Sequence, residues 1–172
     1  MSGVTGYLLD TSALSALYNP THAKHNSVKA FVETLSSTDI MFVSAVAIAE
    51  LNFGAQLYQT DTGYPSTHAT DVLAGAHSYT IRDITRHTGP EYGSVKAKVA
   101  FKYLKDPMDR KYRKPWVEEW IDRNSGGPLK INEGDLWMCA QARERNLILV
   151  TTDQKLKRIS NADPTVQIKE II

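Results

Sequence analysis

The sequence has a single cysteine, Cys139, so neither a disulfide framework nor a zinc site built from several cysteines can form within the chain. No apolar run approaches the roughly 20 residues that a membrane-spanning helix needs. The first residues lack the basic region and long apolar stretch of a signal peptide. Since the net charge is only +1, any nucleic-acid surface must be local. We therefore expect a cytoplasmic protein that has no membrane partner.

Apolar residues make up 42% of the 172 residues and charged residues 23%, which is typical of a globular protein with one domain spanning 1–172. Apolar runs predict strands over 7–9, 40–43, 79–84, 147–150 and 166–171. Helical spacing and capping residues predict helices over 11–18, 25–37, 65–77, 90–104, 116–121 and 134–145, and one that Ser44 caps and that includes 46–53. This alternation predicts an α/β fold, a three-layer α/β/α sandwich with a mostly parallel central sheet.

Four acidic residues occur where the carboxyl ends of parallel strands would meet. Asp10 directly follows the strand in YLLD, and Asp153 lies three residues beyond the strand in LILVTTD. Glu50 and Asp135 lie near the starts of two predicted helices that would begin at the same edge. Clustered carboxylates repel one another, and a divalent cation relieves that repulsion. Oxygen ligands suit Mg²⁺ or Mn²⁺, so the pattern favours a site for one or two such ions.

Each of these acids also has an ordinary structural interpretation. Asp10 can be only the N-cap of the following helix, and Asp135 can be an acid favoured by a helix dipole. Asp153 can be a turn residue. Glu50 is harder to explain in this way, because it interrupts the apolar stretch AVAIAELNFGA. The argument for a site therefore depends on the four residues occurring together.

Four stretches in series resemble the PIN-domain ribonucleases, in particular the VapC-type toxins of bacterial toxin–antitoxin pairs: YLLDTSAL (7–14), VSAVAIAEL (43–51), GDLWMCAQA (134–142) and LVTTDQKL (149–156). The resemblance implies a Mg²⁺- or Mn²⁺-dependent endoribonuclease with a PIN-like fold. It also implies a cognate antitoxin protein and a homodimer. The acidic set that it implies is Asp10, Glu50, Asp135 and Asp153, with orienting hydroxyls on Thr11, Ser12 and Thr151.

Within this set the resemblance implies different roles. Asp10 and Asp135 are expected to be direct metal ligands. Glu50 is expected to bind metal through water or to orient the attacking water, and Asp153 to complete the pocket through water. Taken singly, the three hydroxyl residues are more typical of helix caps and turn formers than of catalytic groups.

The chain departs from the compact family pattern between Glu50 and Asp135, and we interpret residues 93–128 as a helical, basic insertion. Four basic residues there alternate with Tyr112 and precede Trp116: Arg110, Lys111, Arg113 and Lys114. Basic side chains among aromatic ones suit phosphate contacts and base stacking, so we predict that these four bind RNA. The alternative is a solvated helical face whose long side chains cover apolar surface.

Other functions fit the sequence less well. A phosphoacceptor receiver domain would need a pair of adjacent acids after the first strand, and none accompanies Asp10. A haloacid-dehalogenase-type phosphatase would need a second aspartate where Ser12 stands. A stand-alone RNA-processing nuclease and a catalytically inactive PIN-like module that binds RNA or protein both remain open. The five histidines show no spacing of metal ligands.

Overall fold

The computed structural model describes residues 5–172, which form a five-stranded sheet in the order β3-β2-β1-β4-β5. All neighbouring strands are parallel. The strands are β1 (Gly6–Leu9), β2 (Ile40–Ser44), β3 (Thr80–Arg82), β4 (Ile148–Thr151) and β5 (Ile168–Glu170). The helices are α1 (Thr11–Tyr18), α2 (His25–Glu33), α3 (Ala45–Thr62), α4 (Thr67–Ala76), α5 (Thr88–Tyr103), α6 (Glu133–Glu144) and α7 (Lys157–Ala162), with 3-10 turns η1 (Val117–Glu119) and η2 (Gln154–Leu156).

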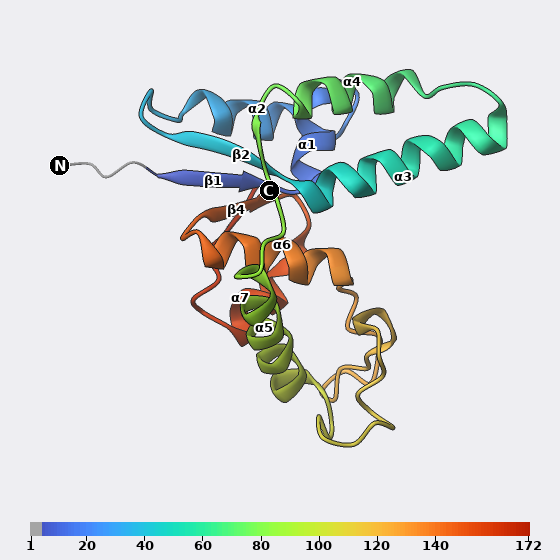
Figure 1. Ribbon diagram of the computed structural model, residues 1–172, viewed down its shortest axis with the longest axis vertical. Coiled ribbons are helices and arrows are strands. Elements are labelled where there is room, and N and C mark those ends of the chain that lie inside the picture. Colours follow the sequence, from blue (N-terminus) through green and yellow to red (C-terminus); the bar gives the residue numbers. More distant parts are fainter. Residues whose placement is uncertain (1–4) are drawn as a thin grey trace.

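The strand order places the helices in two layers. The chain moves outward from β1 to β3 through α1 to α4, then returns through α5 and α6 to β4 and continues through α7 to β5. Right-handed crossovers in opposite directions put these two groups of helices on opposite faces of the sheet. Figure 1 shows α1 to α4 gathered together, and α5 to α7 gathered elsewhere. The predicted three-layer α/β/α sandwich is therefore confirmed.

The two central strands are apolar because both of their faces are covered. Leu8 and Leu9 in β1 and Leu149 and Val150 in β4 are fully buried. Leu9 is paired with Val150, so β1 and β4 end at the same level of the sheet. The acids that follow these two strands therefore come out at one edge.

The segment predicted as a helical insertion is helical only as far as the end of α5. Residues 104–132, here called the α5–α6 loop, are irregular apart from η1 and one isolated bridge between Ile121 and Pro128. The predicted helix over 116–121 is wrong, because only the three residues of η1 have a helical conformation. Two elements were not predicted, α7 and η2, and α3 extends nine residues beyond Phe53.

The α3–α4 hairpin extends away from the sheet in Figure 1. Large apolar side chains are exposed along it and in its connecting turn: Phe53, Leu57, Tyr58 and Tyr64. In the part of the chain that the structure describes, no helix has the length and apolar character to cross a membrane.

Candidate functional site

Asp10 lies at the carboxyl end of β1 and also caps α1. Its backbone N–H donates to the Val150 carbonyl oxygen of β4 at 3.1 Å, and its carboxylate accepts from the Ala13 N–H at 2.7 Å. The side chain is only 3% exposed. Burial raises the pKa of Asp10 to about 6, although hydrogen bonds from Thr151, Ala13 and Ser12 oppose the shift. The capping and site interpretations of Asp10 are therefore compatible with each other.

Asp135 lies in the first turn of α6, where it forms a capping box with Asn132. Each residue's backbone N–H donates to the other's side chain, at 2.7 and 2.8 Å. Asp135 is 8% exposed, and burial raises its pKa to about 7. The nearby charges of Asp10, Asp153 and Glu50 add to this increase in the pKa of Asp135.

Glu50 reaches this edge from α3, and two contacts fix its carboxylate. The Thr11 hydroxyl donates to one carboxylate oxygen. The other oxygen lies against Gly134, where a Cβ atom would approach it to 2.0 Å. Residue 134 must therefore be glycine for Glu50 to keep this position beside Asp135.

Asp153 follows β4, and its side chain is 35% exposed, in contrast to the buried Asp10 and Asp135. Its N–H donates to the Thr151 hydroxyl at 2.9 Å, and its carboxylate lies 3.6 Å from the Lys155 ammonium group. The Ser12 hydroxyl lies 3.2 Å from that of Thr151 and donates to Asp10 at 2.8 Å. The three predicted hydroxyl residues thus connect the ends of β1, β4 and α3.

The donor set suits a hard cation that keeps part of its water. Hydrogen bonds only partly offset the cost of burying the charged carboxylates of Asp10 and Asp135, and a divalent ion would offset the rest. Within residues 5–172 no three His, Cys, Asp or Glu side chains lie close enough to hold an ion together. Mg²⁺ normally retains several water molecules, so it does not need three protein ligands.

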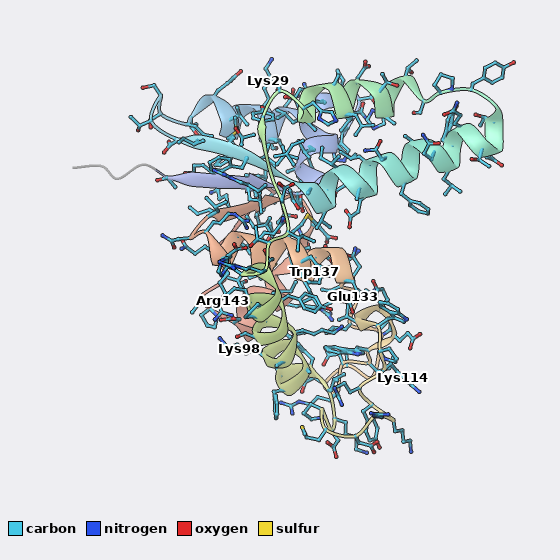
Figure 2. All side chains as sticks on the ribbon, in the orientation of Figure 1. Lys29, Lys98, Lys114, Glu133, Trp137 and Arg143 are labelled. Carbon is cyan, nitrogen blue, oxygen red and sulfur yellow. The ribbon has the colours of Figure 1, made fainter. Side chains whose placement is uncertain are left out.

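The four basic residues predicted to bind RNA lie outside the acidic edge, on the α5–α6 loop. Arg110, Lys111, Arg113 and Lys114 are all exposed. Figure 2 shows Lys114 on this loop, and Glu133 and Trp137 at the end of α6 that faces it. The loop is anchored to that end of α6, because Glu133 accepts from the Val117 N–H at 3.1 Å and from the Lys96 ammonium group at 2.5 Å.

Sequence reasoning missed two features of this region. Asn132 has a recognisable signal, since an Asn three residues before an acid at a helix start is typical of a capping box. The cluster of Glu133, Lys96 and Tyr92 has none, because it joins residues 37 and 41 positions apart. Tyr92 also stacks on Trp137 with ring centroids 3.9 Å apart, and so fixes α5 against α6.

These features define a class of α/β proteins, in which a parallel sheet has buried acidic side chains at its carboxyl edge. The chain belongs to the PIN domain family, whose family model matches residues 7–162. This match confirms the resemblance seen in the four sequence stretches. A comparison with curated protein sequences found no match.

Several solved structures share the fold at low sequence identity. VapBC2 from Rickettsia felis, bound to a DNA fragment from its promoter, has 19% identity and a TM-score of 0.66, covering 96% of this chain and 98% of that one. VapBC-5 from Mycobacterium tuberculosis, a member of a toxin–antitoxin family, has 16% identity and a TM-score of 0.59. The match covers 97% of this chain and 99% of that one. VapC20 from Mycobacterium tuberculosis, a sarcin–ricin loop-cleaving toxin, has 14% identity and a TM-score of 0.54. The match covers 88% of this chain and 92% of that one.

Proposed function

We propose that this chain is a Mg²⁺- or Mn²⁺-dependent endoribonuclease that hydrolyses RNA phosphodiester bonds. The observation that carries the proposal is the presence of two buried carboxyl groups, Asp10 after β1 and Asp135 in the first turn of α6, in a chain of the PIN domain family. The similar fold of VapC20, described as a toxin that cleaves the sarcin–ricin loop, supports RNA as the substrate class.

Asp10 and Asp135 would hold the metal ion directly, and Glu50 and Asp153 would contact it through water. The ion would lower the pKa of a water molecule and neutralise charge on a phosphate oxygen. Thr11 would keep the Glu50 carboxylate turned toward Gly134, in a position to accept a proton from the attacking water.

Ser12 and Thr151 have a supporting role in this proposal. Ser12 donates to Asp10 and accepts from the Thr152 N–H at 2.9 Å, so its position is fixed from both sides. Thr151 accepts from the Asp153 N–H. Together they connect the Asp10 carboxylate to the backbone that carries Asp153. No side chain of the chain needs to act as a nucleophile, since water attacks phosphorus.

The test is digestion of bacterial total RNA with Mg²⁺ or Mn²⁺, compared with EDTA. Asp10→Asn keeps an acceptor for the Ala13 N–H but removes the charge, so cleavage should fall by more than about 100-fold. Asp71→Asn removes an exposed acid from α4 and is the matched control, with unchanged cleavage expected. Cleavage that survives EDTA, or that Asp10→Asn leaves intact, would contradict the proposal.

We also propose that the chain is the toxin of a type II toxin–antitoxin pair and binds a cognate antitoxin protein. The fold it shares with VapBC-5 and with the VapBC2 complex supports this role. Induced expression should arrest growth, Asp10→Asn should not, and co-expression of a small neighbouring open reading frame should restore growth. Growth arrest by Asp10→Asn would refute a toxin that acts by cleavage.

The homodimer and the cytoplasmic location stay predictions. Sedimentation of the purified chain tests the homodimer. A stand-alone RNA-processing nuclease is the alternative role, and a gene neighbourhood without a small partner gene would favour it.

A further inference from the structure

A cavity of about 720 Å³ lies between α5 and the α5–α6 loop, outside the acidic edge. Its floor and walls are largely apolar and come from one face of α5 and from the loop. Trp120 is fully buried there, and its indole N–H donates to the Lys114 carbonyl oxygen at 2.8 Å. The Lys96 ammonium group donates to the Pro115 carbonyl oxygen at 3.3 Å, so α5 is joined to the loop beside the cavity. The cavity is therefore held by side-chain to backbone contacts across the loop.

Two features of its opening are not explained by folding. Phe101 is 61% exposed and Met108 is 73% exposed, although both line an apolar cavity. Arg110, Arg113 and Lys114 line the same cavity, and none of them forms an ion pair with any described residue. Apolar surface beside uncompensated cations is complementary to a ligand that has a flat apolar part and a negative charge.

We propose that this cavity binds one unpaired nucleotide of the substrate RNA, with its base against Phe101 and its phosphate between Arg110, Arg113 and Lys114. The proposal rests on the nuclease function proposed above and adds a subsite for one base and its phosphate, away from the acidic edge. A base can enter the cavity only when it is unstacked and unpaired, and exposed aromatic side chains stack on such bases irrespective of sequence.

The position of the cavity favours RNA over an acidic peptide. Lys96 lines the cavity and binds Glu133, which lies two residues before Asp135 in the first turn of α6. We therefore expect one RNA strand to have a nucleotide in the cavity and another phosphate at the acidic edge. A peptide with acidic side chains would meet repulsion at that edge, whereas an RNA strand has to reach it in order to be cut.

The test measures binding by fluorescence anisotropy in EDTA, so that no cleavage occurs. The two probes are a fluorescein-labelled 12-mer of adenosine ribonucleotides and a 12-mer of the same backbone without bases. Phe101→Ala should weaken binding of the base-containing probe about 10-fold, or about 1.4 kcal/mol, and leave the abasic probe unchanged. Arg113→Ala should weaken both probes, because it removes a phosphate contact.

Tyr64→Ala is the matched control, since Tyr64 is an exposed aromatic residue in the turn between α3 and α4. It should leave both affinities unchanged. Equal affinity of Phe101→Ala and the unaltered chain for the base-containing probe would overturn the proposal, as would an equal loss for both probes. RNA cleavage by the unaltered chain is measured separately, so a failed nucleotide site and a failed nuclease function give different results.

Discussion

Asp135→Asn is expected to stabilise the metal-free protein above pH 7, although it removes a residue proposed to bind metal. The pKa of Asp135 is about 7 in the folded chain and 3.8 for an exposed aspartate. The difference corresponds to about 4 kcal/mol, because each pKa unit is worth about 1.4 kcal/mol. Asparagine carries no charge and keeps an oxygen that can accept from the Asn132 N–H, so the capping interaction survives.

The direction of the pH dependence follows from proton binding. Between pH 3.8 and about 7 the folded chain holds a proton on Asp135 that the unfolded chain has released, so the free energy of unfolding falls as pH rises. The Asp135→Asn variant has no carboxyl group at this position, so its free energy of unfolding does not fall in this way. Its advantage should therefore be about 2 kcal/mol at pH 5 and about 4 kcal/mol at pH 8. For a chain of this size the larger value corresponds to about 10 °C in melting temperature.

The measurement is urea unfolding in EDTA at pH 5, 6, 7 and 8, followed by circular dichroism, with Asp71→Asn as the control for an exposed acid. Added Mn²⁺ should raise the stability of the unaltered chain at pH 8, and should have little effect on Asp135→Asn, because ligands that bind only the folded state stabilise it. A variant less stable than the unaltered chain at pH 8, or an advantage independent of pH, would refute the assignment of Asp135 as a buried, electrostatically strained acid.

Four further variants test the site and the core. Gly134→Ala should displace the flexible Glu50 side chain, and so lower RNA cleavage at least about 10-fold while the melting temperature changes little; full activity would contradict a role for this Glu50 position. Asp163→Asn should cost about 3 kcal/mol in urea unfolding, because this fully buried carboxylate pairs with Lys98 and Arg143. Leu149→Ala, at a fully buried position in β4, should cost about 2–5 kcal/mol, whereas Leu57→Ala on the exposed hairpin should change stability by less than about 0.5 kcal/mol.

The central sheet could be predicted because local sequence carries enough information there. β1 and β4 are buried on both faces and therefore read as short, continuous apolar runs. Asp10 and Asp153 follow these runs directly, and parallel pairing then brings them to one edge without further information. The start of α3 was predictable from Ser44, which accepts from the Val46 N–H.

The α5–α6 loop could not be predicted in the same way. Trp116 and Trp120 have the i, i+4 spacing of a helix, but the structure buries only Trp120 and directs its indole to the Lys114 carbonyl. The loop's shape depends on partners outside it, such as Lys96 for the Pro115 carbonyl and Arg158 for the Leu129 carbonyl. A linear pattern holds no information about such pairs, and tertiary contacts decide the conformation.

The α3–α4 hairpin affects how the protein will behave in solution. Phe53 and Leu57 are one helical turn apart and both face water, with Tyr58 beside them. Apolar side chains gathered on a protruding element adhere to one another as concentration rises. The purified chain should therefore precipitate at modest concentrations unless this hairpin is covered, and serine at positions 53 and 57 should extend the concentration range usable for crystallisation.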